Sequence, residues 1–563
     1  MKLLLVILAA LLLLECYKTT RSPSGDFANY YTASRLALAD SLDKVDLYDH
    51  YGFQQQIQRY FRGTLGSFIP FPPSTVLVMI PLAWLPPSAA RNTSMIINML
   101  ALCTIIWFCS RLSGLPLFTV SIIALLSGFS LWSNFREGQV YLVLTLLIAL
   151  ALAAEGNGKN FLAGLLLGAA APIKYFTLLF IAYFLLRKNY RLVMGAIVST
   201  LAVFGAGLVF AGVGVNEYYL TDILPRHLAG NIQNPFAVNF QSFNSLINSL
   251  LVRSDTLNPN PVIESAFLAS WLKLFLSLFF LLLLVGGIYS VRWKEKKHRT
   301  LYDASLLTLF GLVTSPASAS YHLVLLILPM VFLVSLFPQW ERENDVEFPR
   351  RRMLLIGAAY VAINMVPFQL LCNFTDRSLL QLLAYSKLFL LVTLFMAALP
   401  PDILHSRLLR RSVIAAFAFS FAVALARHTA AKEKDGAVWT GVDGLIIADL
   451  SYHDGSLYYC RETPSGFVGM KDGRRWRLNR PLPDRTTEDG VFTAFDSSLG
   501  SSREIFIRDN TICTIHQVTR SRGINKEPVW SSDGSRLYFL SDRGRGIDCT
   551  TIFYIPVERS ELR

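Results

Sequence analysis

Charged side chains are scarce in this sequence. Only 16% of the 563 residues are Asp, Glu, Lys or Arg, whereas 53% are hydrophobic. A soluble globular domain carries charge at about a quarter of its positions, so this composition excludes an ordinary soluble protein. Apolar runs long enough to cross a bilayer recur as far as Arg427. The sequence therefore predicts a polytopic membrane protein.

Cysteine is also scarce, and the seven cysteines are scattered without a CxxC motif or a His/Cys cluster. The sequence therefore predicts no zinc site, and we expect no metal and no cofactor. Glu15 rather than a small residue precedes Cys16, which argues against a lipoprotein signal. No A-x-A-like cleavage site follows the apolar residues 3–14, so we favour an uncleaved first helix over a cleaved signal peptide.

The basic excess, a formal net charge of +13, does not require nucleic acid as a partner. Loops rich in Lys and Arg are typical of the cytoplasmic side of membrane proteins, and here they occur at 187–191, 292–299, 350–352 and 407–411. The apolar runs give roughly 12–13 crossings. This topology places loops 18–72 and 215–264 and the C-terminal tail on the extracytoplasmic face. We predict an all-α membrane domain over 1–428, followed by a separate domain over 429–563.

Two arrangements of the first half of the chain fit this orientation. In one, residues 73–85 cross the bilayer and 161–186 form a single helix. In the other, 73–85 are re-entrant and 161–186 form two half-helices broken by a proline. We favour the second, because it moves 136–139 and Lys174 to the face that holds Asp26. Polar groups at membrane depth are costly unless they converge on a cavity.

The polar side chains on that face each allow two interpretations. Asp26, in the stretch Gly25-Asp26-Phe27, is either a helix cap or a catalytic base. Arg136 is either an interfacial arginine or part of a site, and His322 is either an interfacial histidine or functional. Lys174 lies inside a long apolar region, where an ionisable residue is a functional hypothesis by default.

This set of side chains suits transfer from a lipid-linked phosphate donor. A carboxylate can accept the proton of an attacking hydroxyl, and Lys174, Arg136 or His322 can neutralise the departing phosphate where the dielectric is low. Aromatic side chains such as Tyr30 and Tyr31 can stack on a sugar or line a groove for a prenyl chain.

Two other functions remain open. One is a transporter or flippase of lipid-linked saccharides, because transporters also place ionisable groups near broken helices. The lack of an obvious internal duplication and the position of the polar groups near one face argue against it. The other is a catalytically inactive scaffold whose C-terminal domain binds a partner.

Short motifs in order over residues 20–335 resemble those of a known family. They are Gly25-Asp26-Phe27-x-x-Tyr30-Tyr31, Asp46-Leu47-Tyr48-Asp49, Phe71-Pro72-Pro73, Pro81-Leu82-Ala83, Gly138-Gln139-Val140, Ala163-Gly164-Leu165-Leu166-Leu167-Gly168-Ala169 with Ile173-Lys174, Thr314-Ser315-Pro316, Tyr321-His322 and Leu328-Pro329. With them the chain resembles the polyprenol-phosphate-sugar-dependent membrane glycosyltransferases, specifically glycosyltransferase family 87.

The resemblance implies the C-type glycosyltransferase fold and an inverting transfer of a sugar, with mannose expected. The donor is a polyprenyl phosphate carrier in the membrane lipid, and the acceptor is a hydroxyl of a glycolipid or glycan on the extracytoplasmic face. Asp26 matches the catalytic position and His322 the histidine at the active-site rim. Lys174 matches the lysine assigned to donor phosphate, and Gln139 matches the glutamine of the Gly-Gln pair.

Two further sets of side chains complete the candidate site. Arg136 is assigned with Lys174 and Gln139 to the donor phosphate and lipid, and Tyr30 and Tyr31 are assigned to the sugar or acceptor. Asn239-Phe240-Gln241-Ser242 looks like a degraded version of an Asn/Gln/Ser segment of the family. Gln241 and Ser242 are therefore also candidate sugar or acceptor residues.

The tail from Ala430 is a different kind of sequence, with short alternating runs between turn signals. Asp-Gly pairs at 454–455, 489–490 and 533–534 each precede a candidate strand. Residues 527–534, Glu-Pro-Val-Trp-Ser-Ser-Asp-Gly, are similar to TolB-type propeller repeats. Three blades' worth of chain cannot close a propeller ring, so the tail is either an open β-domain or pairs with another subunit. We therefore predict a small all-β extracytoplasmic domain that shields the active site or binds acceptor.

Overall fold

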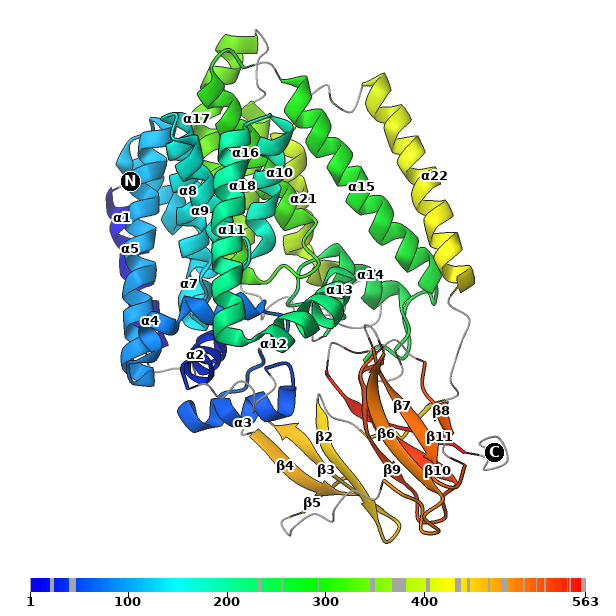
Figure 1. Cartoon of the computed structure of the whole chain (residues 1–563). Coiled ribbons are helices and arrows are strands. Elements are labelled where there is room, and N and C mark those ends of the chain that lie inside the picture. Colours follow the sequence, from blue (N-terminus) through cyan, green and yellow to red (C-terminus); the bar gives the residue numbers. More distant parts are fainter. Residues whose placement is uncertain are drawn as a thin grey trace.

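In the computed structural model, helices form the first part of the chain and strands form the last. The structure describes residues 2–20, 25–39, 47–230, 234–254, 257–291, 293–344, 350–366, 381–400, 403, 406–430, 437–442, 446–463, 466–476, 485–499, 502–512, 514–520, 523–543, 545 and 548–557. Helices run from α1 (Lys2–Thr19) to α22 (Arg407–Ala430), and the first strand begins at Val438. The predicted fold class, a helical membrane part followed by an all-β part, is confirmed (Figure 1).

Five of the described helices are long and apolar enough to cross a bilayer. They are α5 (Pro87–Ser113), α11 (Tyr190–Ala211), α15 (Ala266–Ser290), Ser320–Trp340, and Arg407–Ala426 within α22. The fourth joins the 3-10 helix η5 (Ser320–Leu326) to α17 (Ile327–Asn344), and it is the most deeply buried of the five. A sixth candidate is the pair α6 (Leu117–Leu125) and α7 (Gly128–Glu137), which meet at a bend of 69°.

The other helices are shorter or carry more charge. They are α2 (Gly25–Leu38), α3 (His50–Tyr60), α8 (Tyr141–Gly156), α9 (Asn160–Ala170), α10 (Leu178–Leu186), α12 (Val213–Tyr218), η4 (Tyr219–Ile223), α13 (Leu224–Leu228), α14 (Phe243–Leu251), α16 (Lys296–Val313), α18 (Arg350–Met365), α20 (Gln381–Ala384) and α21 (Ser386–Ala398). The number of crossings expected from hydropathy, roughly 12–13, stays a prediction.

Both apolar stretches that allowed two arrangements are broken in the structure. Residues 73–85 form the 3-10 helix η2 (Pro73–Val78) and α4 (Ile80–Ala83), each far too short to cross a bilayer. In the second stretch, α9 ends before Pro172, and the chain resumes as η3 (Tyr175–Thr177) and α10. Proline lacks a backbone donor and disfavours a helical residue before it. Lys174 lies in this break with an extended backbone, φ −143° and ψ 110°.

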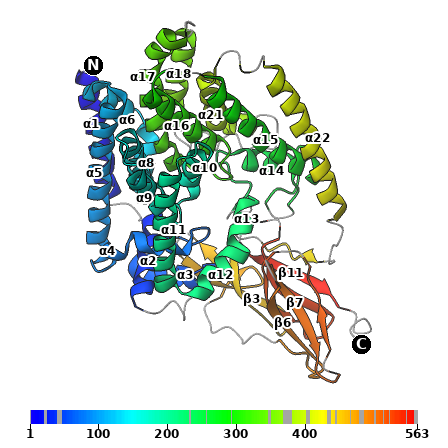
Figure 2. The same cartoon turned by 45° about the horizontal axis from the view of Figure 1, so that its top comes forward.

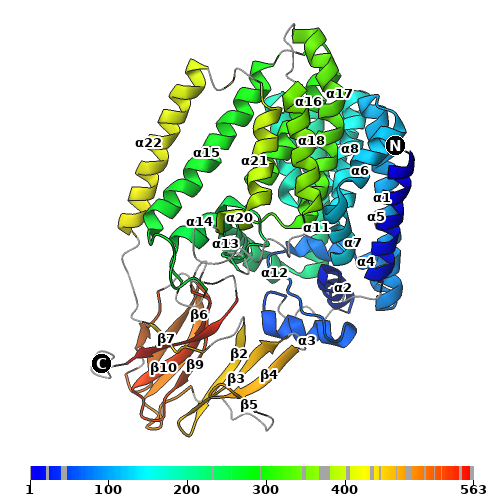
Figure 3. The ribbon, with the colours of Figure 1, turned by 180° about the vertical axis from the view of Figure 1, so that it is seen from behind.

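A layer of short helices lies between the long helices and the strands. It contains α2, α3, α12 and α13 (Figures 1 and 3). The tilted view places α12 and α13 next to the strands (Figure 2). The helices α11, α16, α18 and α22 each begin at the opposite end of the bundle (Figure 1). The basic residues at these helix starts therefore lie far from the layer of short helices.

The β part contains three antiparallel sheets. Their strands are β1 (Val438–Trp439), β2 (Ile447–His453), β3 (Ser456–Thr463), β4 (Gly466–Lys471), β5 (Arg474–Arg475), β6 (Phe492–Leu499), β7 (Ser502–Asp509), β8 (Ile515–Gln517), β9 (Asn525–Trp530), β10 (Arg536–Ser541) and β11 (Thr551–Pro556). The sheet orders are β1-β11-β10-β9, β2-β3-β4-β5 and β6-β7-β8. Strand β9 packs against β2 on one side and against β6 and β7 on the other, so its sheet is the middle one. The resemblance to propeller repeats stays a prediction.

The Asp-Gly pairs mark turns in this β part. Asp454 and Gly455, both with positive φ (47° and 76°), join β2 to β3 in a tight hairpin. Such a two-residue loop needs the left-handed conformation at both positions, which Asp-Gly tolerates well. Gly490, with φ +70°, comes just before β6, and Gly534, with φ +65°, lies between β9 and β10. The turn chemistry expected from the sequence is therefore present at all three places.

Candidate active site

Asp26 lies in the first turn of α2, and close backbone contacts with the end of α7 fix its position. Gly25 has φ +48°, and a Cβ atom there would lie 2.1 Å from Oε2 of Glu137. Gly138 has φ +65°, and a Cβ atom there would lie 2.4 Å from Cβ of Phe27. Only glycine allows both approaches without strain. The start of α2 is thereby held beside Gln139, the residue that follows Gly138.

The carboxylate of Asp26 accepts hydrogen bonds from two amide side chains. Nε2 of Gln139 donates to Oδ2 at 2.6 Å, and Nδ2 of Asn29 donates to Oδ1 at 3.1 Å. Burial raises the pKa of Asp26, and the Gln139 hydrogen bond and the Lys174 charge oppose this rise. A carboxylate that is held in place and made more basic in this way is a better proton acceptor than an exposed aspartate.

A chain of hydrogen bonds links Asp26 to Lys174. Gln139, which donates to Asp26, accepts from the Tyr30 hydroxyl at 2.7 Å, and Nζ of Lys174 donates to the same hydroxyl at 3.3 Å. Tyr30 and Gln139 are fully buried, so they lie behind the pocket and couple the two ionisable groups. The Lys174 ammonium lies 4.7 Å from the ring centroid of Phe71 and 5.1 Å from that of Tyr141, distances that favour a cation–π contact.

His322 lies in η5, on the opposite wall of the same pocket. Its Nδ1 accepts the backbone N–H of Ala319 at 3.1 Å, which assigns the ring proton to Nε2. The ring packs between Tyr141 and Tyr321, with centroids 4.5 and 4.8 Å away. Both the proton position and the ring orientation are therefore set by the local structure.

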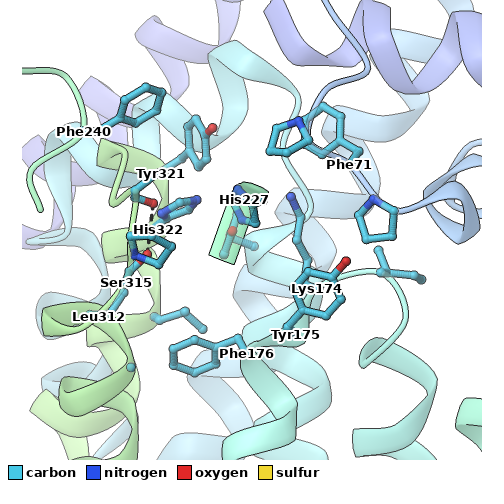
Figure 4. A pocket seen from close by; sticks show the side chains of 18 of the residues that line it. Phe71, Lys174, Tyr175, Phe176, His227, Phe240, Leu312, Ser315, Tyr321 and His322 are labelled. Carbon is cyan, nitrogen blue, oxygen red and sulfur yellow. Dashed lines mark hydrogen bonds between the residues drawn. The ribbon is translucent and has the colours of Figure 1, made fainter. Parts of the chain in front are cut away.

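These elements enclose a pocket of about 370 Å³ at the end of the bundle nearest the strands. Asp26, Lys174 and His322 all line it. The other lining residues are Ser67, Ile69, Pro70, Phe71, Pro72, Tyr141, Ile173, Tyr175, Phe176, Leu179, His227, Leu228, Phe240, Gly311, Leu312, Thr314, Ser315, Pro316, Ala317, Tyr321 and Leu325. In Figure 4 the side chain of Lys174 and the ring of His322 approach from opposite walls. Residues predicted from distant parts of the sequence thus meet in one pocket.

Besides Tyr30 and Gln139, four further predicted site residues lie outside the pocket lining. The Tyr31 hydroxyl donates to the carbonyl of Leu85 at 2.8 Å. Arg136 is 43% exposed, and its guanidinium lies 5.1 Å from the ring of Trp132. Gln241 and Ser242 are buried behind the 315–319 loop.

The contacts of Gln241 and Ser242 fix the loop that precedes His322. The backbone N–H of Gln241 donates to the carbonyl of Ser318 at 2.9 Å, and the Ser242 hydroxyl donates to the carbonyl of Pro316 at 2.9 Å. Ser242 also caps α14. Their contacts support the pocket wall rather than form it.

One histidine of the pocket was not anticipated from the sequence. His227, on the five-residue helix α13, lines the pocket together with Leu228. Its Nδ1 is buried and has no hydrogen-bond partner among the described residues. Burial, and then the charge of Lys174, lower the pKa of His227 to about 4, so the ring is neutral at physiological pH. The surrounding sequence has no motif that marks this position.

A second cavity, of about 270 Å³, meets the pocket at Ile173 and Lys174. It lies between η2, α4, α5, α8 and the end of α9. Its other lining residues are Val78, Met79, Leu82, Ser94, Ile97, Asn98, Val140, Val143, Leu144, Leu147 and Ala170. The lysine therefore lies between the pocket that holds Asp26 and His322 and a second, almost wholly apolar cavity.

No group of three or more His, Cys, Asp or Glu side chains in the described part of the chain is arranged to bind a metal ion. The expectation that no cofactor is needed stays a prediction.

Comparison with known proteins connects this pocket to a family. Residues 68–316 match the model of glycosyltransferase family 87. This range contains Lys174 and His227; Asp26 precedes it and His322 follows it. The family expected from the short motifs is thus found independently.

Two mannosyltransferases of Mycobacterium tuberculosis are similar to the chain. The polyprenol-phosphate-mannose-dependent alpha-(1-2)-phosphatidylinositol pentamannoside mannosyltransferase of strain CDC 1551 / Oshkosh is 27% identical over 319 residues, which cover 55% of this chain and 67% of that protein. The polyprenol-phosphate-mannose-dependent alpha-(1-2)-phosphatidylinositol mannoside mannosyltransferase of strain ATCC 25618 / H37Rv is 26% identical over 304 residues, which cover 50% and 66%. Through residues 68–316, the helical part of this chain is therefore similar to glycosyltransferase family 87.

Proposed function

We propose that this membrane glycosyltransferase transfers a mannosyl residue from a polyprenyl phosphate to a hydroxyl of a lipid-linked or glycan acceptor. The observation that carries the proposal is the joint position of Asp26 and Lys174 in one pocket, linked through Tyr30 and Gln139. In a displacement reaction the base can accept the proton of the attacking hydroxyl, and the cation can stabilise the phosphate that leaves. The mannosyl group and the polyprenyl carrier come from the names of the two similar proteins.

The two cavities that meet at Lys174 favour a lipid-linked donor. The apolar cavity offers a place for the first prenyl units, and the pocket that contains Asp26 and His322 offers a place for the phosphate and sugar. Lys174, at their junction, is then within reach of the phosphate that joins prenyl chain and sugar. An ammonium acts as a strong point charge at low dielectric.

In the proposed step, the acceptor hydroxyl gives its proton to Asp26 while its oxygen forms a bond to the anomeric carbon. The bond between that carbon and the phosphate oxygen breaks, and the polyprenyl phosphate leaves with the electron pair. Attack opposite the leaving group inverts the configuration. Lys174 stabilises the negative charge that develops on the phosphate, and His322 can donate its Nε2 proton to an oxygen at the rim.

The remaining predicted residues lie outside the pocket lining, and most of them hold the side chains or loops that form it. Gln139 and Tyr30 orient the base and couple it to Lys174. Tyr31 fixes α2, while Gln241 and Ser242 fix the loop before His322. Arg136, half-exposed beside the pocket, is a candidate contact for lipid head groups.

We place this reaction at the extracytoplasmic face. The pocket lies at the end of the bundle nearest the strands, whereas the basic starts of α11, α16, α18 and α22 lie at the other end (Figure 1). Basic residues are retained on the cytoplasmic side. The β part would then be an extracytoplasmic domain over 429–563, next to a membrane domain over 1–428.

The test is a transfer assay with the purified protein in liposomes. Polyprenyl-phosphate mannose, labelled in the sugar, is supplied with a glycolipid acceptor, and wild type is compared with Asp26→Asn. We expect Asp26→Asn to lose transfer and Glu217→Gln, which removes an exposed carboxylate on α12, to retain it.

Transfer by Asp26→Asn at the wild-type rate would overturn the assignment of the base. If wild type transfers no sugar but moves the intact donor across the bilayer, the protein is a flippase. If it does neither and instead binds a partner through its β part, it is a scaffold.

A further inference from the structure

The β part contacts the pocket walls through three ionisable residues that lie close together. Lys526 is in β9, Asp542 follows β10, and Asp548 precedes β11. We call these three residues the clamp. All belong to the middle sheet or its connections, and Asp542 and Asp548 are at most 2% exposed. The clamp therefore has little contact with solvent.

The first clamp contact is with α13. The guanidinium of Arg226 forms an ion pair and hydrogen bond with Oδ2 of Asp542, and the two side chains are 10% and 0% exposed. Asp542 is itself held by its own part of the chain, because Oδ1 accepts the N–H of Ile524 at 2.8 Å and Oδ2 accepts the N–H of Asp548 at 3.0 Å. The carboxylate that holds α13 is thus a rigid feature of the β part.

The second clamp contact is with the start of α3. Nζ of Lys526 lies 2.7 Å from Oδ1 of Asp548 and 3.4 Å from Oδ1 of Asp49. Oδ2 of Asp548 accepts the backbone N–H of His50 at 2.9 Å. Burial alone would lower the pKa of Lys526, but the neighbouring carboxylates of Asp548 and Asp49 raise it. The ammonium therefore stays charged and bridges the two parts.

The two helices that the clamp contacts, α13 and α3, are directly connected to residues that line the pocket. On α13, the residue after Arg226 is His227, which lines the pocket with its unpartnered nitrogen. Asp49 caps α3, and the segment after α3 supplies Ser67 and 69–72 to the lining. In Figure 4, His227 lies between His322 and Lys174. A displacement of the β part would therefore move two walls of the pocket.

We propose that Lys526, Asp542 and Asp548 are positioning residues for glycosyl transfer: the β part completes the active site by holding α13, and with it His227, against the pocket. This inference rests on the proposed function. His227 then offers its unpartnered nitrogen to a hydroxyl of the bound sugar or acceptor. Because α13 has only one and a half turns and packs beside a π-helical segment, η4, it depends on an external contact for its place.

The test compares Arg226→Met, which removes the charge and keeps the apolar stem, with Arg226→Lys, which restores a cation. The matched control is Arg253→Met, whose exposed ion pair with Glu264 lies in the same loop region. Three quantities are measured on the full-length protein in detergent or liposomes: kcat and KM for transfer, hydrogen exchange of the α13 amides, and the thermal unfolding midpoint.

We expect Arg226→Met to lower kcat by roughly 10- to 100-fold, because a shift of about 1 Å in a positioning residue has an effect of this size. Its α13 amides should exchange faster while those of α9 and α11 do not. Arg226→Lys should recover a substantial part of kcat, and Arg253→Met should match wild type in all three measurements.

Wild-type kcat/KM in Arg226→Met, together with faster exchange in α13, would overturn the positioning role. Unchanged exchange in α13 would overturn the clamp itself. If Arg226→Met unfolds as a whole, Asp542→Asn, which keeps an acceptor for the N–H of Ile524, supplies the same comparison. If wild type shows no transfer, the proposed function fails, and the exchange data still decide whether the clamp holds α13.

Discussion

The carboxylate of Asp26 is connected to the ammonium of Lys174 through the side chains of Gln139 and Tyr30. The three hydrogen bonds measure 2.6, 2.7 and 3.3 Å. The donors and acceptors alternate, so a change of charge at one end alters the polarisation of the other. The two groups can therefore face different parts of a substrate and still respond to each other's protonation.

The first prediction concerns Gln139. Burial raises the pKa of Asp26, and the Gln139 hydrogen bond opposes this rise. In Gln139→Leu the pKa of Asp26 should rise further, so the acid limb of the kcat/KM profile should move to higher pH. The loss of a hydrogen bond to a charged group should lower kcat/KM by roughly 10- to 100-fold. A kcat/KM profile that is lower than that of wild type but has its acid limb at the same pH would contradict the effect of Gln139 on the pKa of Asp26.

The second prediction concerns the stability of Asp26→Asn. Because burial raises the pKa of Asp26 in the folded state, the folded protein binds this proton more tightly than the unfolded chain, whose carboxyl has a pKa of about 3.9. The free energy of unfolding therefore falls as the pH rises from about 4 through the folded pKa, and is constant above it.

Asp26→Asn has no ionisable group at this position, so its free energy of unfolding does not fall in this way as the pH rises. It should unfold at a higher temperature than wild type at neutral pH, and the difference should vanish below about pH 3.5. Thermal unfolding at several pH values, with Glu217→Gln as control, measures this. An asparagine variant that is less stable than wild type at neutral pH would indicate that the carboxylate is a structural anchor.

The third prediction concerns Lys174. Lys174→Met keeps the apolar stem but removes the cation beside Tyr30 and Phe71. We expect kcat to fall by about 10²- to 10³-fold, as for the loss of one group that stabilises developing charge. Lys159→Met removes an exposed lysine before α9 and should have no effect. A variant impaired only at limiting donor would place Lys174 in donor binding and not in the transfer step.

The fourth prediction tests the apolar cavity. Leu147→Trp, on α8, places a larger side chain into the 270 Å³ space that reaches Lys174. The KM for a long polyprenyl donor should rise several-fold, whereas a donor with a short chain should be used as before. Leu162→Trp, at a 45% exposed position on α9, is the control. Equal effects on long and short donors would show that the chain binds elsewhere.

Hydropathy and charge in the sequence were sufficient to predict the class of fold and the convergence of Asp26, Lys174 and His322. The break at Pro172 could be predicted because proline acts locally. Arg136 lies three residues before Gln139, yet Gly138 between them adopts φ +65°, and the turn sends Arg136 outward and Gln139 inward. Such a turn changes the direction of neighbours in a way that spacing alone does not reveal.

His227 could not be predicted because no local pattern places it. Its helix is short, and its position depends on Arg226 and on Asp542, which is 316 residues further along the chain. Gln241 and Ser242 carry the residue types of a binding segment, but they are used to hold the loop before His322. A side chain's chemistry indicates what it can bind, whereas the direction it faces depends on the whole fold.

The contact between His50 and Asp548 joins positions 498 residues apart, which has a consequence for synthesis. A ribosome adds roughly 5–20 residues per second, so after α3 is made about 25–100 s pass before the strand residues that contact it exist. In the later part of that interval the nascent chain already contains Asp26 and Lys174 but lacks the contacts that hold two walls of the pocket. The order of translation thus delays the completion of the pocket until the strands emerge.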